Sequence, residues 1–157
     1  MTYKKKSWKE KLADDKNYPK VEPLTGKMIE KWGKGTLVIP APKNVDDIMN
    51  LVPQGKLTTI NEIRSYLAKK NNATICCPIT TGIFSWISAH AAEEDRSNGE
   101  KNITPYWRTL KSDGELNPKY PGGIENQKIL LESEGHEVFK KGKRWLVYDY
   151  ENKLMKF

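Results

Sequence analysis

The chain has 157 residues, of which 37% are hydrophobic and 30% charged, so we expect one water-soluble domain with a hydrophobic core. No apolar run approaches the ~20 residues of a membrane span, and the basic N-terminus lacks the apolar segment of a secretory signal. These features predict a cytoplasmic protein with no membrane partner. The net charge of +7 favours an anionic partner, nucleic acid ahead of a membrane surface.

Residues 1–43 are expected to form a basic arm with one short strand. Residues 7–12 have the composition of a short helix, and residues 36–39 that of a strand ended by prolines. Trp8 and Trp32 are expected to dock parts of the arm on the domain, because two exposed tryptophans would be unusual. The arm begins with five lysines that can track a DNA backbone or lie in solvent: Lys4, Lys5, Lys6, Lys9 and Lys11.

Three helices are then expected, over residues 44–52, 59–70 and 78–94. Asn44 and Thr59 are residue types that cap helix N-termini through their side-chain oxygens. The second and third helices are joined by a short turn, the pattern of a helix-turn-helix.

The third of these helices has two distinct faces. Apolar residues with helical spacing predict an amphipathic stripe of Ile79, Ile83, Trp86 and Ile87. The polar side carries hydroxyls that either reach DNA phosphates and groove edges or form an ordinary solvated face: Thr80, Thr81 and Ser85. Ile79 is either a wedge between base steps or a core residue.

The remaining elements are a loop over residues 95–120, a helix over 124–134 with Gly135 as its C-cap, and a β-hairpin at 138–148. The tip of the hairpin is basic and either contacts DNA as a wing or is a solvated turn. Its charged residues are Lys140, Lys141, Lys143 and Arg144.

Residues 44–135 resemble the DNA-binding domain of alkylguanine-DNA alkyltransferases. The resemblance implies an α+β, mostly helical, winged helix-turn-helix-like domain over residues 44–157, with the hairpin at its end. The order and spacing of the matching residues carry this resemblance: residues 52–56, Thr58, Thr59, Ile63, Gly82, Pro105, Arg108, Gly114, Gly122, Gly123, Leu130, Leu131, Glu134 and Gly135.

The sequence departs from that family at its reactive residues. The family's loop reads Pro-Cys-His-Arg, with a Cys that accepts the alkyl group, whereas Tyr106 and Trp107 stand at the Cys and His positions here. Only the Glu of the family's relay remains, as Glu134. The family's base-stack Arg and phosphate-rotating Tyr fall at Ile79 and Ile60. The alkyltransferase-like branch also lacks the Cys and binds lesions without repairing them.

We therefore expect a non-catalytic, cofactor-free monomer that binds double-stranded DNA, recognises a damaged base such as an alkylated guanine and marks it for repair proteins. The resemblance implies a lesion pocket formed by Tyr106, Trp107, Arg108 and Glu134. The alternative is that Tyr106 plugs the pocket and Trp107 packs in the core.

Two other function classes stay open. An enzyme acting on a flipped base would use Glu134 for excision, or would accept an alkyl group on Cys76 or Cys77, whose thiol pKa the helix dipole would depress. A protein-interaction module would keep the fold and lose DNA binding. The adjacent cysteines disfavour a disulfide, and neither they nor His90 and His136 have the spacing of a metal site.

Overall fold

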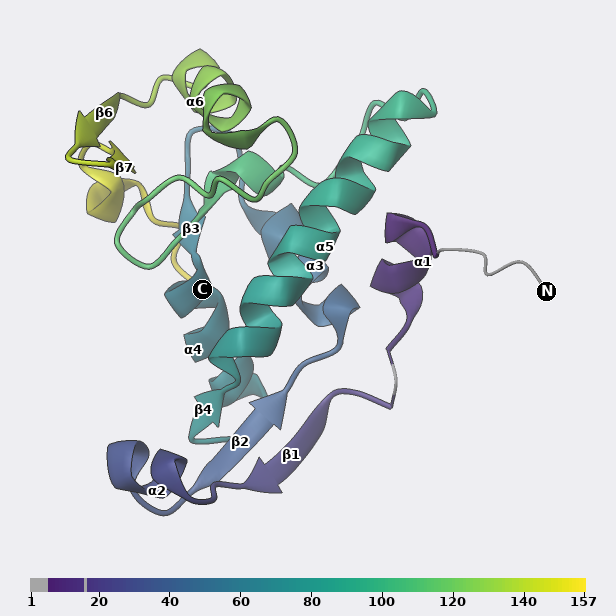
Figure 1. The fold of residues 1–157 in the computed structure, drawn as a ribbon, viewed down its shortest axis with the longest axis vertical. Coiled ribbons are helices and arrows are strands. Elements are labelled where there is room, and N and C mark those ends of the chain that lie inside the picture. The colour runs from purple at the N-terminus through teal and green to yellow at the C-terminus, as the bar shows by residue number, and fades with distance from the viewer. Residues whose placement is uncertain (1–5, 16) are drawn as a thin grey trace.

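A long helix, α5 (Pro78–Ser97), runs through the middle of the molecule, and the helices α1 (Trp8–Ala13), α3 (Pro42–Leu51) and α4 (Ile60–Lys70) pack against it (Figure 1). This computed structural model describes residues 6–15 and 17–157. Lys4 and Lys5 of the expected basic arm lie outside the described residues. No helix in the described part of the chain is long and apolar enough to span a bilayer.

The face of α5 that packs into the core differs from the expected one. Thr81, Ser85 and Ser88 are buried, together with the alanines that follow them. Of the expected apolar stripe, Ile87 is buried as expected, whereas Ile79 and Ile83 are exposed. Both sets of residues repeat with the helical period, so the pattern alone did not distinguish them. Small side chains allow α5 to lie close to α3, and the hydroxyl of Ser88 donates a hydrogen bond to Asp46 on that helix.

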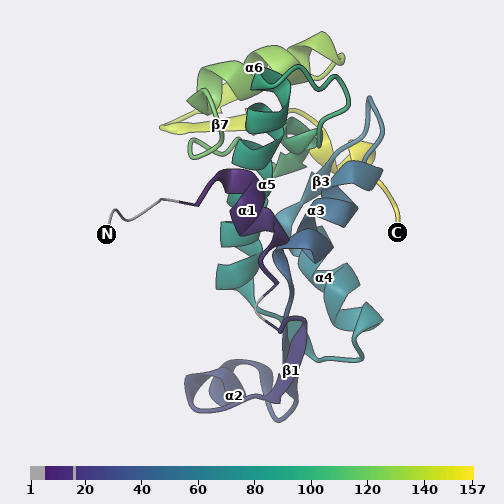
Figure 2. The same ribbon diagram turned by 90° about the vertical axis from the view of Figure 1, so that its right-hand side faces the viewer.

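The N-terminal segment contains more regular structure than an extended arm. The expected short helix is confirmed as α1, and two further elements follow: β1 (Lys20–Pro23) and α2 (Lys27–Trp32). Figure 2 shows α1 against α5, while β1 and α2 lie at the end of the molecule away from α6. Trp8 stacks on the ring of His90 with 4.5 Å between centroids, so the expected docking of this residue is confirmed.

A three-stranded sheet joins the N-terminal segment to the rest of the chain. The expected strand is confirmed as β2 (Thr36–Ile39) and lies between β1, which is antiparallel to it, and β4 (Ile75–Cys76), which is parallel. Trp32 packs against a small apolar cluster beside this sheet.

The caps of α3 and α4 show one correction and one confirmation. Helix α3 begins at Pro42, and Asn44 accepts a hydrogen bond from the backbone N–H of Ala41 at 2.8 Å, so Asn44 lies within the first turn and is not the N-cap. Thr59 is the N-cap of α4, and its hydroxyl accepts from the N–H of Glu62 at 3.2 Å.

The expected loop after α5 contains two short elements: the 3₁₀ helix η1 (Tyr106–Arg108) and the strand β5 (Thr109–Leu110), which pairs in parallel with β3 (Thr58–Thr59). This parallel register places η1 beside the segment that precedes β3, and η1 also contacts α3, α5 and α6.

The last third of the chain confirms the expected helix and hairpin. Helix α6 (Gly123–Ser133) is terminated by Glu134 and by Gly135, which has a φ of 91°, and the N–H of His136 donates to the carbonyl of Leu131 at 3.1 Å. The hairpin consists of β6 (Val138–Lys141) and β7 (Arg144–Val147), and the 3₁₀ helix η2 (Tyr150–Lys153) follows it.

Candidate nucleic-acid interface

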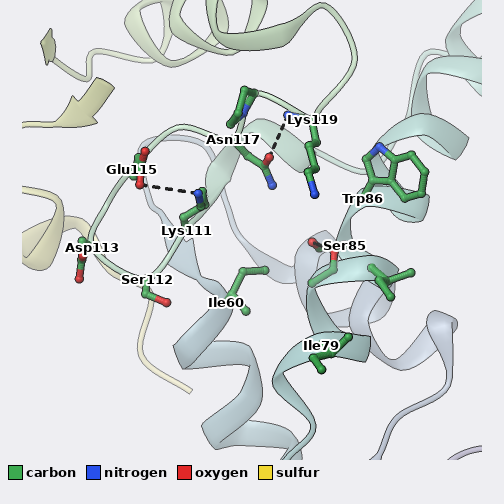
Figure 3. A pocket seen from close by; sticks show the side chains of 13 residues that line it. Ile60, Ile79, Ser85, Trp86, Lys111, Ser112, Asp113, Glu115, Asn117 and Lys119 are labelled. Carbon is green, nitrogen blue, oxygen red and sulfur yellow. Dashed lines mark hydrogen bonds and ion pairs between the residues drawn. The ribbon is translucent and has the colours of Figure 1, made fainter. Parts of the chain in front are cut away.

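An open cavity of about 830 Å³ lies between the first turns of α5 and the loop formed by residues 111–119. Its helix side is apolar, and its loop side is polar and charged (Figure 3). The helix side is lined by Ile60, Ile79, Ile83 and Trp86, and the loop side by Lys111, Asp113, Glu115, Asn117 and Lys119. A flat ligand with an apolar face and polar edges matches this distribution.

The apolar rim of the cavity combines the two positions at which the family resemblance predicts DNA-handling residues. Ile60 begins α4 and Ile79 lies in the first turn of α5, yet both line the same cavity (Figure 3). Ile79 is 71% exposed and Ile83 is 44% exposed. The core alternative for Ile79 is therefore wrong, because its side chain is available to an external partner.

Gly82 gives the cavity its width on the helix side. A Cβ atom built at this glycine would meet no heavy atom within 4 Å. Any larger side chain at this position would therefore project into the cavity and not into the core.

Tyr120 carries a buried hydroxyl near two residues that line the cavity. Tyr120 is almost fully buried, and its hydroxyl makes no hydrogen bond of normal geometry to the described residues, although Ser85 and Asn117 lie near it. Burial raises the pKa of Tyr120, so this phenol stays protonated and keeps a proton to donate.

Tyr106 fills the core and does not line the open cavity. Its side chain is fully buried, and its hydroxyl donates to Glu93 at 2.6 Å and accepts from the side-chain amide of Asn126 at 3.1 Å. Burial and the neighbouring Glu93 raise the pKa of Tyr106. The expectation that this residue shapes an open lesion pocket is therefore corrected in favour of the plugged alternative.

Trp107, Arg108 and Glu134 form a hydrogen-bonded clamp between η1 and the end of α6. The carboxylate of Glu134 accepts from the indole N–H of Trp107 at 2.9 Å and from two guanidinium nitrogens of Arg108 at 2.9 and 2.7 Å. Arg108 also donates to the backbone carbonyl of Val52 at 2.8 Å. This clamp supports the loop from inside, and none of its three side chains lines the cavity.

The pKa of Glu134 reflects this clamp. Its side chain is only 8% exposed, and burial raises the pKa, but the hydrogen bonds from Arg108 and Trp107 outweigh burial. The net effect lowers the pKa of Glu134 below its ordinary value. A carboxylate with a lowered pKa and with its oxygens already engaged by Arg108 and Trp107 is a poor general acid, which argues against the excision hypothesis.

The hydroxyls expected on the DNA-facing side of α5 bond within their own helix. Thr81 is fully buried and donates to the carbonyl of Cys77 at 2.7 Å, and Thr80 donates to the same carbonyl at 3.4 Å. Ser85 is also fully buried, although it borders the cavity, and its hydroxyl donates to the carbonyl of Gly82 at 2.8 Å. These positions correct the expectation of a free polar face, because the exposed face of α5 is the isoleucine face.

The basic hairpin residues fall into two groups. Lys140, Lys141 and Lys143 are exposed, as a phosphate contact requires. Arg144 instead bonds to Asp113 at 3.1 Å and to Glu115 at 3.2 Å, both in the loop that borders the cavity.

Both cysteines are buried, which argues against the alkyl-acceptor hypothesis. Cys76 is 1% exposed and Cys77 is 9% exposed. Burial raises the pKa of Cys76, the opposite of the expected effect of the helix dipole. Within the described residues, no three His, Cys, Asp or Glu side chains are grouped to hold a metal ion.

The sequence did not indicate that residues of the 111–119 loop would line a binding cavity. Lys111, Glu115, Asn117 and Lys119 lie in a segment with no hydrophobic period and ordinary surface composition. The one available signal was the position of this segment between the resemblance residues Arg108 and Gly122, which places it beside the family's active-site loop.

Comparison with solved structures decides the fold. The chain is similar to S. pombe Atl1 in its crystal structure with damaged DNA containing O6-carboxymethylguanine, at 21% identity and a TM-score of 0.54, over 73% of this chain and 94% of that one. It is similar in the same way to S. pombe ATL in complex with DNA, at 22% identity and a TM-score of 0.54, over the same shares of both chains. The chain has the fold of the alkyltransferase-like proteins.

The alkyltransferase-like fold agrees with the resemblance found in the sequence and confirms the mixed α+β, mostly helical class with a small hairpin. No protein-family model matches the sequence, and no curated protein matches it either. The likeness therefore extends to the fold, and the use of the cavity has to be argued from its own residues.

Proposed function

We propose that this protein binds double-stranded DNA and holds an extruded, modified base in the cavity beside α5, without altering it chemically. The observation that carries this proposal is the cavity itself. It opens beside the exposed isoleucine face of α5, and its size falls within the range of small-molecule sites. A base with an added alkyl group, such as an alkylated guanine, is the ligand class that fits this shape and chemistry.

The two walls of the cavity divide the recognition of a base between them. The apolar wall of Ile60, Ile83 and Trp86 offers surface for a base face, since flipped bases are held by stacking and by edge hydrogen bonds. The opposite wall offers amide and ammonium groups to the edges of the base, on Asn117 and Lys119.

Ile79 is suited to occupy the space that the extruded base leaves in the duplex. It projects from the first turn of α5 at the rim of the cavity, where the family resemblance implies an inserted Arg. Apolar wedges of this kind separate base steps in several minor-groove binders. In this proposal α4 and α5 act as the helix-turn-helix and the hairpin acts as a wing, whose Lys140, Lys141 and Lys143 contact phosphates.

We propose binding without a reaction because the candidate nucleophiles are buried. Tyr106 occupies the position of the family's acceptor Cys, and its hydroxyl is buried and bonded to Glu93. Cys76 and Cys77 are buried at the N-terminal end of α5, whereas η1 bonds to its C-terminal half. Tight binding without turnover is compatible with a protein that marks a lesion for repair proteins.

Fluorescence-anisotropy titrations test this function. The protein is titrated with a duplex that carries one O6-carboxymethylguanine and with the same unmodified duplex, each at two salt concentrations. The proposal expects tighter binding to the modified duplex at both. Equal and strongly salt-dependent binding to the two duplexes would reduce the protein to a backbone binder, and no binding to either would refute the DNA function. Intact-mass measurement after incubation should show no added alkyl group.

A further inference from the structure

The loop that borders the cavity is attached to the C-terminal hairpin through its backbone. The N–H of Leu116 donates to the carbonyl of Trp145 at 2.9 Å, and the N–H of Val147 donates to the carbonyl of Gly114 at 3.0 Å. Glu115 and Leu146 thereby form an antiparallel bridge. The cavity wall thus continues the small sheet of β6 and β7 on the outer side of β7.

A chain of ion pairs runs along the same seam. Arg144 binds Asp113 at 3.1 Å through one guanidinium nitrogen and Glu115 at 3.2 Å through another. Glu115 also pairs with Lys111 at 3.7 Å, and Figure 3 shows this pair on the loop side of the cavity. One hairpin side chain is therefore linked, through two carboxylates, to three residues that line the cavity: Lys111, Asp113 and Glu115.

Tyr150 holds the same loop from below. Gly114 has a φ of 79°, and a Cβ atom at this position would collide with the Tyr150 ring. The loop is thus fixed at Gly114 by close packing and on either side of it by Arg144. Loops that present several polar groups to a ligand need such support, because a small displacement of the groups weakens every contact.

We propose that Arg144 is a positioning residue: it holds the cavity wall in the geometry that discriminates between modified and unmodified bases. Arg144 itself makes no phosphate contact. This proposal rests on the function proposed above. The guanidinium of Arg144 is already engaged by two carboxylates, whereas Lys143, the preceding residue, makes no ion pair within the described part of the chain. The two neighbours should therefore act on DNA binding in different ways.

The experiment compares Arg144→Ala with Lys143→Ala, which removes the same charge from the adjacent position. Arg144→Ala should lower the preference for the O6-carboxymethylguanine duplex about three- to tenfold, the range expected for two partly exposed ion pairs. It should leave the salt dependence of binding to the unmodified duplex unchanged. Lys143→Ala should keep the preference and reduce the salt slope by about 0.9, as the loss of one phosphate contact does. The reverse pattern would overturn the proposal.

Two further variants separate positioning from general destabilisation. Arg144→Lys keeps one charge and should recover part of the preference. The double variant Arg144→Glu with Glu115→Arg exchanges the two charges. It should show a stronger preference for the modified duplex than either single variant.

If the wild-type protein shows no preference between the duplexes, the proposed function is refuted, but the role of Arg144 in holding the loop can still be tested. Hydrogen exchange provides that test. The amides of Leu116 and Val147 should exchange faster in Arg144→Ala than in Lys143→Ala. Equal exchange in the two variants would overturn the assignment of Arg144.

Discussion

The phenol hydroxyl of Tyr106 donates a hydrogen bond to the carboxylate of Glu93 at 2.6 Å, which joins η1 to α5 inside the core. Removing this hydroxyl in Tyr106→Phe leaves Glu93 and Asn126 without a shared partner. We expect a loss of about 2 kcal/mol in the free energy of unfolding, measured by urea denaturation, because hydrogen bonds to charged groups are among the stronger ones.

The control for this prediction is Tyr148→Phe, since the Tyr148 side chain is largely exposed and should change stability by less than about 0.5 kcal/mol. Equal effects of the two substitutions would show that the bond to Glu93 contributes nothing. A third variant, Tyr106→Cys, should accept no alkyl group, because Trp107 offers no base and Glu134 is engaged by Arg108.

The buried pair of Arg108 and Glu134 should make stability depend on pH. Glu134→Gln removes the charge that compensates Arg108, and we expect a loss of about 3 kcal/mol at pH 7. Because the folded-state pKa of Glu134 lies below its ordinary value, its contribution is fully present above that ordinary value and is lost as the pH falls through the lowered pKa.

Urea denaturation at pH 7 and at pH 3 measures this effect. The gap in stability between the wild type and Glu134→Gln should narrow at the lower pH, whereas the exposed neighbour Glu132, changed to Gln, should show no such gap. A gap that is constant with pH would indicate a purely steric effect of the amide.

Gly82 offers a way to close the cavity without disturbing the core. Gly82→Leu should raise the stability of α5 by about 1 kcal/mol, because Gly is a poor helix former and no atom lies within 4 Å of the added Cβ. The same side chain should abolish the preference for the modified duplex in anisotropy titrations. Gly82→Ala is the matched control, with similar stabilisation and little loss of preference. If Gly82→Leu discriminates as well as the wild type, the base lies elsewhere.

Ile79 should matter for DNA binding and not for folding. Ile79→Ala removes a side chain that is 71% exposed, so the melting temperature should change little. Affinity for the modified duplex should fall about tenfold, the loss expected when a wedge no longer fills the gap in the base stack. Ile129→Ala, at an isoleucine on α6 that is 57% exposed, should leave affinity unchanged. Similar binding by both variants would remove the wedge from the proposal.

The hairpin lysines should contribute affinity that does not depend on the base. Changing Lys140 and Lys141 together to Glu should weaken binding to modified and unmodified duplexes by the same factor, and should reduce the slope of log affinity against log salt by up to about 1.8. The double change Lys69→Glu and Lys70→Glu at the end of α4 alters the net charge equally. If both pairs have the same effect, net charge alone explains it.

The sequence alone predicted those elements that local chemistry determines. Thr59 and Gly135 mark helix ends because their side chain or backbone satisfies terminal groups in any tertiary context. The hairpin at 138–148 follows from apolar segments on either side of a glycine-containing turn. The resemblance to alkyltransferases was likewise visible in the order and spacing of single matching residues, and the shared fold confirms it.

Tertiary packing decided what the local pattern left open. The stripe of Ile79 and Ile83 and the stripe of Thr81, Ser85 and Ser88 have the same helical period, and only the packing of α1, α3 and α4 against α5 selects the small residues for the core. The same holds for the site. Residues as distant in sequence as Ile60, Ile79 and Lys119 line one cavity, while Tyr106 turns inward, because burial and hydrogen-bond partners depend on contacts between elements.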